Sequence, residues 1–203
     1  MNNLAYSSQD KEAVGPRVEE LLRKELAAMA PLVYAVEDEG AGETGALTML
    51  KDARNAFFGG AATPVFTLRF QIPQPRATGL DVHLNRRGVG CYAGSLVYTT
   101  VLNGNFSGEV TLDEEGRFQG DPNASGKLNA RKDLLKKCGA FAVTKGGLAG
   151  FEMKVPRVLR ITPREDSAEI VVVTLPRSKS MGFSASFGSK EFFDLASDIE
   201  AAM

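Results

Sequence analysis

The spacing of apolar residues along the chain changes near residue 64. Before that point they recur every three or four positions, the period of an α-helix, at Val18, Leu21, Leu22, Leu26 and Met29. Pro16 stands where its missing N–H suits the first turn of this helix, and Pro31 ends it. A second helical stretch covers roughly 45–58, with Thr44 as its N-cap. The pattern predicts two N-terminal helices.

Beyond residue 64, apolar residues alternate with polar ones, which is the period of a β-strand with one buried face. The first such strand runs from Phe66 to Ile72. Further strands are expected at 80–84, 89–92, 95–102, 106–112, 151–155, 158–161, 168–175 and 181–187. Asn103-Gly104, a tight-turn dipeptide, separates two of them. The most apolar strand, 168–175, is expected at the centre of a sheet.

Two more helices are expected in the strand-rich part of the chain. The stretch 119–127 is polar and predicts a loop, and a helix follows over 130–138 with Asn129 as its N-cap. The chain ends in an amphipathic helix of about fourteen residues, or about 21 Å, capped by Ser189. The apolar side of this helix carries Phe192, Leu195, Ala196, Ile199 and Met203. This element order, with hairpin turns, indicates an α+β fold with an antiparallel sheet or a partly open barrel.

The last quarter of the chain has a recognisable order of elements. Residues 151–203 read as three strands followed by a capped amphipathic helix. This order resembles the C-terminal half of pleckstrin-homology-like domains, in which a final helix plugs one end of a bent antiparallel barrel. The resemblance rests on element order and implies that the last helix closes such a barrel here. A helix-grip fold, with the sheet wrapped around that helix, is the alternative interpretation.

Charge is unevenly distributed, although 24 Lys and Arg nearly balance 25 Asp and Glu among the 203 residues. Residues 1–43 hold nine acids and four bases, a net −5, so the remainder carries +4 to give the total of −1. With 43% apolar residues, the chain is long enough to bury a core of its own. We expect a flexible polar tail over 1–15 and a single domain over 16–203. A sub-boundary near 140–150 is left open.

Targeting signals and cysteines bear on the compartment. The N-terminus has no apolar leader, and no run of 18 apolar residues occurs, so the interpretation is a soluble cytoplasmic protein. Cys91 and Cys138 are expected to be reduced thiols. Because the net charge is not positive, a protein that coats nucleic acid is excluded, and we expect no specific nucleic-acid partner.

Catalytic and cofactor motifs do not fit this sequence. The stretch 120–127 has the wrong glycine spacing for a P-loop, and Leu128 stands where a magnesium-binding hydroxyl is needed. The acids at 113–116 lie between strands and do not match an EF-hand. His83 is the single histidine, so any histidine-dependent mechanism must use it. We therefore expect no cofactor and no metal, and we favour a protein that is not an enzyme; carboxylate pairs formed by the fold stay open.

Basic residues are the remaining candidates for chemistry. The predicted ligand-binding residues are Arg157, Arg160, Arg177, Ser178 and Lys179. If 158–162, 168–175 and 181–187 form a meander, the loop after 168–175 approaches Arg157 at one rim of the sheet, with Arg164 at the opposite rim. Guanidinium forks and hydroxyls suit phosphate or carboxylate groups. Basic loops that merely solubilise a sheet edge are the alternative explanation.

Three functional hypotheses follow from the sequence. The first is a non-catalytic binding module that holds an anionic ligand or an acidic protein segment at a basic sheet rim. The second is an assembly subunit that docks through its acidic N-terminal segment, 1–43, on a protein partner. The third is an enzyme of unassigned class, which would need a polar pocket containing perturbed carboxylates or His83. The oligomeric state stays undetermined at this level.

Overall fold

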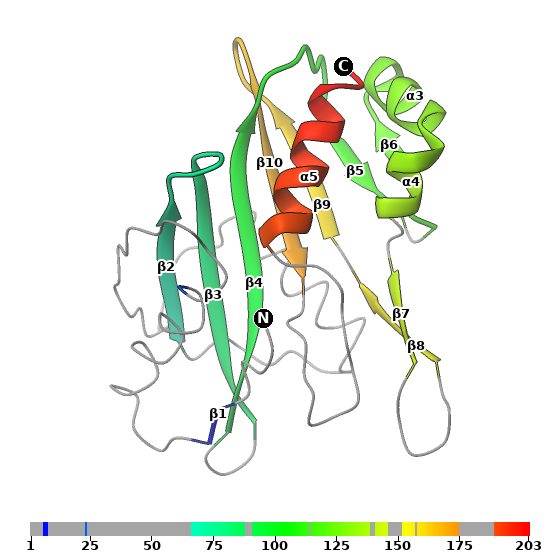
Figure 1. Ribbon diagram of the computed structural model, residues 1–203. Coiled ribbons are helices and arrows are strands. Elements are labelled where there is room, and N and C mark those ends of the chain that lie inside the picture. Colours follow the sequence, from blue (N-terminus) through cyan, green and yellow to red (C-terminus); the bar gives the residue numbers. More distant parts are fainter. Residues whose placement is uncertain are drawn as a thin grey trace.

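The computed structural model describes residues 6–7, 23, 66–87, 91–113, 115–138, 141–145, 152–156, 158–174 and 189–203. This part of the chain is an antiparallel sheet with helices against it, which confirms the α+β class (Figure 1). The helices whose bounds are described all lie between residues 122 and 200. The predicted helices at 16–31 and 45–58 fall outside the described residues, apart from the helical residue Arg23.

The main sheet is antiparallel throughout and open. Its strands are β2 Phe66–Ile72, β3 Thr78–Arg87, β4 Cys91–Leu102, β5 Val110–Leu112, β6 Phe118–Gly120, β9 Val158–Pro163 and β10 Ala168–Thr174. They follow the order β2-β3-β4-β10-β9-β5-β6, with β2 and β6 at the two ends of the described path. A short strand, β1 Tyr6–Ser7, pairs with the start of β4. Strand β10 lies between β4 and β9, which confirms the predicted central position of the most apolar strand.

Three expected strand contacts differ from the pairing in the structure. No hairpin joins β4 to β5 at Asn103-Gly104, because β4 pairs with β3 and β10, whereas β5 pairs with β6 and β9. The meander considered for 158–162, 168–175 and 181–187 also does not fit, because β10 pairs with β9 on one edge and with β4 on the other, while 181–187 lies outside the described residues. Finally, β8 Glu152–Pro156 leaves the main sheet and pairs with β7 Phe141–Lys145 in a separate two-stranded ribbon. Strands β8, β9 and β10 are therefore not three neighbouring strands of one sheet, as the pleckstrin-homology resemblance implied.

The expected polar loop at 119–127 is also wrong. It contains the end of β6 and the helix α3 Pro122–Ala130, and α4 Lys132–Cys138 follows directly. Asp121 caps α3 by accepting hydrogen bonds from the N–H groups of Asn123 and Ala124, and Pro122 occupies the first helical turn. Asn129 is not an N-cap, because its side-chain amide bonds both backbone groups of Phe118 and so ties α3 to β6.

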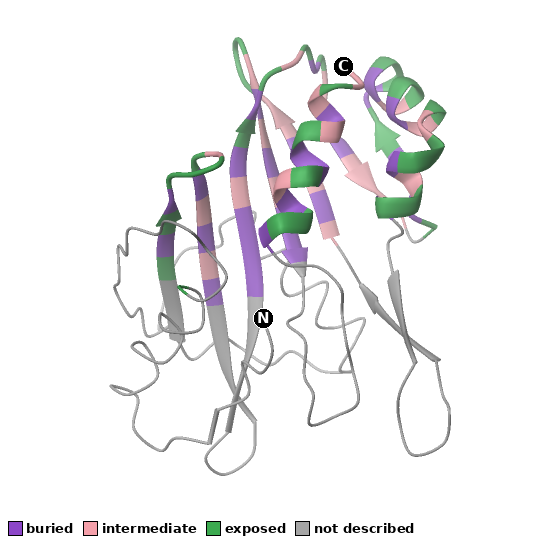
Figure 2. Cartoon of the chain, viewed as in Figure 1, coloured by how far each residue is buried: buried purple, intermediate pink, exposed green. Residues whose placement is uncertain are grey.

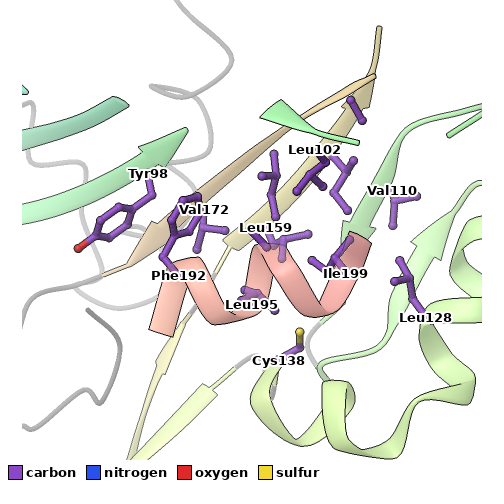
Figure 3. Close-up of a cluster of buried hydrophobic side chains, with 14 of the residues drawn as sticks. Tyr98, Leu102, Val110, Leu128, Cys138, Leu159, Val172, Phe192, Leu195 and Ile199 are labelled. Carbon is purple, nitrogen blue, oxygen red and sulfur yellow. The ribbon is translucent and has the colours of Figure 1, made fainter. Parts of the chain in front are cut away.

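One face of the sheet is packed against α5 Ser189–Glu200, which crosses in front of β10 and β9 in Figure 1. Buried residues alternate with half-buried ones along β9, whereas the central strands β4 and β10 also hold consecutive buried residues, at 96–98 and 172–173 (Figure 2). The buried set from four elements meets in one core: Tyr98, Leu102, Leu159, Val172, Phe192, Leu195 and Ile199 (Figure 3). The predicted apolar side of α5 is thereby confirmed, with Met203 half-buried beside this core.

The N-terminal end of α5 is fixed to β4 by Tyr98. Its ring is fully buried and stacks on Phe192 at a centroid distance of 4.9 Å. Its hydroxyl lies 3.2 Å from the Ser189 hydroxyl, which is also buried, so the two polar groups satisfy each other. A ring stack and a hydrogen bond thus hold the same end of the helix.

We expect Tyr98→Phe to lower the free energy of unfolding by about 1 kcal/mol, since the stack is kept and one buried hydrogen bond is lost. Urea denaturation measures the change. Ser189→Ala should cost a similar amount, and the double variant should cost less than the sum of the two. Fully additive losses would show that the Tyr98–Ser189 contact does not stabilise the fold.

The C-terminal end of α5 is held by polar contacts instead. The Arg76 guanidinium pairs with the Glu200 carboxylate and also donates to the backbone oxygen of Val101 at 3.1 Å. Glu200 accepts a second hydrogen bond, 2.7 Å long, from the backbone N–H of Asn103. Glu200 therefore connects the β2–β3 turn, the end of β4 and the last turn of α5.

Candidate functional site

Arg160 is the one predicted ligand-binding residue that the structure describes. It lies on β9, between Val171 of β10 and Thr111 of β5 in the strand register. Residues 157 and 177–179, which complete the predicted set, fall outside the described residues, so their convergence stays a prediction. Arg164 lies in the turn between β9 and β10, the opposite rim expected for it.

Arg160 belongs to a row of side chains on the face of the sheet opposite α5, which we call the outer face. Direct cross-strand partners point to the same face of a sheet. The register places one residue of each strand in this row: Gln71, Gly79, Thr99, Val171, Arg160, Thr111 and Gln119. All are half-buried or exposed, whereas the residues that flank Arg160 on β9, Leu159 and Ile161, are buried. The row is therefore a mostly polar strip across the side of the sheet opposite α5.

The guanidinium of Arg160 is incompletely satisfied. Its Nε atom is buried but forms no hydrogen bond with any described residue. The Glu109 carboxylate lies 3.7 Å from Nε, close enough for charge attraction but too far for a hydrogen bond. A buried N–H without an acceptor is unfavourable, and a carboxylate is the strongest acceptor for a guanidinium. The whole side chain is 33% exposed, so part of it reaches solvent although Nε does not.

Two other arginines on this side of the sheet, whose side chains the structure describes, are engaged by acids. Arg69 on β2 pairs with Asp81 on β3 at 3.2 Å. Burial raises the pKa of Asp81, although the Arg69 guanidinium opposes the shift. Arg164 pairs with Glu169 at 3.1 Å. Within the described part of this face, Arg160 therefore differs from its neighbours in having an acid nearby but no hydrogen bond to it.

The position of Glu109 is fixed by Asp121. The backbone N–H of Asp121 donates to the Glu109 carbonyl oxygen at 2.9 Å. Asp121 Oδ2 also accepts three hydrogen bonds from the two residues before Glu109. The donors are the Ser107 N–H, the Ser107 hydroxyl and the Gly108 N–H, at 2.7, 2.7 and 3.1 Å. The hydrogen bond from Ser107, with those from the helix N–H groups, lowers the pKa of Asp121 to about 2. Every contact of this carboxylate is internal, so Asp121 organises the site rather than binding a ligand.

Sequence reasoning missed Glu109, Thr111 and Asp121. The first two reach Arg160 only because β5 pairs with β9, and about fifty residues separate them along the chain. Asp121 had a readable signal, since Asp followed by Pro suits the start of a helix. Gly120, Asn123 and Gly126, which are typical of loops, obscured that signal.

The described residues give little support to the other candidate centres, which are His83, the cysteines and a metal site. His83 lies on β3 opposite Thr67 and Ser95, and its side chain falls outside the part of the chain that the structure describes. Cys138 is a buried thiol at the end of α4. In the described ranges, no group of three or more His, Cys, Asp or Glu side chains could hold a metal ion. None of the helices described there is long and apolar enough to cross a membrane.

Comparison with known proteins adds no identification. A scan against family models, a search of curated proteins and a search of solved structures each found no match to this chain. The acidic segment proposed for assembly, 1–43, lies outside the described residues except for Tyr6, Ser7 and Arg23. Among the described residues, the outer face around Arg160 is accordingly the candidate binding site.

Proposed function

We propose that this protein is a non-catalytic binding module that holds an acidic segment of a partner protein on the outer face of its sheet, with Arg160 as the anchor. The observation that carries the proposal is the buried Arg160 Nε without a hydrogen-bond acceptor among the described residues, whereas Arg69 and Arg164 are paired with acids. A small swing of the side chain would let an incoming carboxylate accept from both sides of the fork. Glu109 is too distant for this role in its present position.

The surroundings of Arg160 favour a carboxylate in an extended peptide over a phosphorylated head group. A phosphate carries up to two charges and is usually held by several basic groups. Here one guanidinium stands in a row whose neighbours are Thr99, Val171 and Thr111. The threonine hydroxyls can donate to or accept from a peptide backbone laid across the strands. The chemistry therefore supports one carboxylate with polar contacts along the strip.

Fluorescence anisotropy of a labelled hexaglutamate peptide, titrated with the full chain, tests the proposal. We expect Arg160→Gln to weaken binding about tenfold, since charge-assisted hydrogen bonds contribute about 1.5–3 kcal/mol. Glu109→Gln should tighten binding by about threefold, because it removes the competing carboxylate. A matched hexaglutamine peptide controls for backbone contacts alone.

Arg164→Gln is the matched control, because it removes the same charge from the turn that follows the same strand, at a guanidinium already paired with Glu169. It should leave hexaglutamate binding unchanged. If Arg160→Gln and Arg164→Gln weaken hexaglutamate binding equally, the effect comes from net charge alone and the proposal is overturned. Tighter binding of inositol trisphosphate than of hexaglutamate, abolished by Arg160→Gln, would replace the acidic segment with a phosphate ligand. Near-ultraviolet circular dichroism checks that each variant remains folded.

A further inference from the structure

The connection from β4 to β5 begins with an Asn-Gly pair, in which the asparagine is exposed and the glycine half-buried. Asn103 and Gly104 directly follow Leu102, the last residue of β4, and belong to neither a strand nor a helix. The backbone N–H of Asn103 donates to Glu200, but the N–H of Gly104 makes no hydrogen bond to a described residue. The side-chain amide of Asn103 and the next backbone nitrogen are thus neighbours without competing partners in the described part of the chain.

We propose that Asn103 is a site of spontaneous deamidation, and that its modification loosens the C-terminal end of α5. The Gly104 nitrogen loses its proton to water and attacks Cγ of Asn103. The new N–Cγ bond closes a succinimide ring as the Cγ–Nδ2 bond breaks, and Nδ2 takes a proton back from water and leaves as ammonia. Water then adds to one of the two ring carbonyls and opens the ring. The products at position 103 are aspartate or isoaspartate, and no oxidant or reductant takes part.

Two other exposed asparagines lack the features that favour ring closure. Asn105 is followed by Phe106, whose bulky ring is buried in the core. Asn123 lies in the first turn of α3, where the next N–H, that of Ala124, donates to Asp121 at 3.3 Å. Glycine at 104 has no Cβ to shield its nitrogen or restrict the dihedral angles needed for attack. Asn103 therefore combines exposure, a following glycine and an unengaged nucleophile.

The consequence follows from what surrounds position 103. Glu200, at the end of α5, accepts the hydrogen bond from the Asn103 N–H and pairs with Arg76. Either product adds a negative charge to the residue whose backbone N–H is bonded to the Glu200 carboxylate, and like charges repel. The repulsion acts directly on the contact that holds the last turn of α5.

Isoaspartate adds a second effect because it lengthens the main chain by one methylene. The backbone at Gly104 is closely packed, since a Cβ there would lie 3.1 Å from the Phe106 ring and 3.3 Å from the Cβ of Met203. The extra methylene cannot be inserted without shifting these neighbours. Both effects act on the same end of α5, so deamidation is an irreversible change in how this helix is held.

Peptide mapping by mass spectrometry tests the site itself. The full chain is incubated at mildly alkaline pH and sampled over days, and isoaspartate is separated from aspartate by retention time. We expect deamidation at Asn103 to be about tenfold faster than at Asn105 or Asn123, which serve as internal controls. Equal rates at the three positions would overturn the assignment.

The effect on α5 is tested by thermal unfolding of fresh and aged protein. Asn103→Gln keeps the amide but must close a larger ring, so its Tm should stay constant during ageing, whereas the Tm of the wild type falls. Asn103→Asp introduces the charge without the methylene, and its Tm should lie between those of fresh and isoaspartate-containing protein. A modified wild type with an unchanged Tm would contradict the link to α5.

Discussion

Phe192→Ala will lower the free energy of unfolding by about 3–5 kcal/mol, the range for truncating a fully buried aromatic side chain. Phe192 has no exposed surface and stacks on Tyr98, so the change leaves a cavity between α5 and β4. Leu159 and Val172 lie in the same core and cannot collapse far into this space, since both belong to paired strands (Figure 3). Urea denaturation, followed by far-ultraviolet circular dichroism, measures the loss.

Phe193→Ala is the matched control for this prediction. Phe193 is the next residue of α5 and contacts Phe192 edge to face at 6.1 Å, but it is only half-buried. The same chemical change there should cost about 1 kcal/mol, because less apolar surface leaves water and no closed cavity forms. Similar losses for the two variants would mean that α5 packs on the sheet by a different face.

Periodicity predicted the elements that carry a continuous apolar pattern. Strand β10 was recognised as the most apolar run of the chain, and helix α5 because its apolar residues follow a period of about 3.6. Their local patterns agree with their tertiary environments, so sequence and fold give the same answer. The class of the fold follows from such elements alone.

Pairing between strands was less accessible, because alternation marks a strand but not its neighbours. Asn103-Gly104 was expected to form a tight turn, yet the chain crosses there to the far side of β9. The local turn preference is overridden by the Asn103–Glu200 contact and by the hydrogen bonds from Ser107 and Gly108 to Asp121. These contacts join residues that are 13 to 97 positions apart, beyond the reach of a local rule.

The candidate site was likewise only partly predictable from the sequence. The charge pattern singled out Arg160, but its importance was expected from other basic residues near it in sequence. In the structure its nearest acid is Glu109, and the hydroxyl-bearing neighbour in the register is Thr111. Neither could be inferred before β5 was known to pair with β9.

Asp121→Ala should lower the Tm by about 5 °C, because one carboxylate satisfies two separate elements. Its Oδ1 caps α3, and its Oδ2 holds the Ser107–Gly108 backbone before β5. Asp121→Asn separates the two roles. Asparagine is an equally good N-cap, but its NH2 group would face the Ser107 and Gly108 donors. We therefore expect the asparagine variant to lose most of the loop contribution and to keep the helix cap.

The pH dependence provides an independent test of the same contacts. The pKa of Asp121 is lowered from 3.8 in the unfolded chain to about 2 in the fold, chiefly by the hydrogen bond from Ser107. The stabilisation by the carboxylate is thus fully present above pH 3.8 and is lost as the pH falls through 2. The difference in the free energy of unfolding between wild type and Asp121→Ala should be constant near neutral pH and shrink in acid. Denaturation by guanidinium chloride at a series of pH values measures this difference.

Asp133→Asn is the control for the acid titration, because Arg131 lowers the pKa of Asp133 to about 2 as well. The pair is two residues apart and largely exposed, so much of it can also form in the unfolded chain. Since linkage depends on the difference between the folded and unfolded states, this variant should change stability little at any pH. A pH-independent deficit for Asp121→Ala, or an acid-sensitive one for Asp133→Asn, would show that the Asp121 contacts are not what stabilises the α3–β5 region.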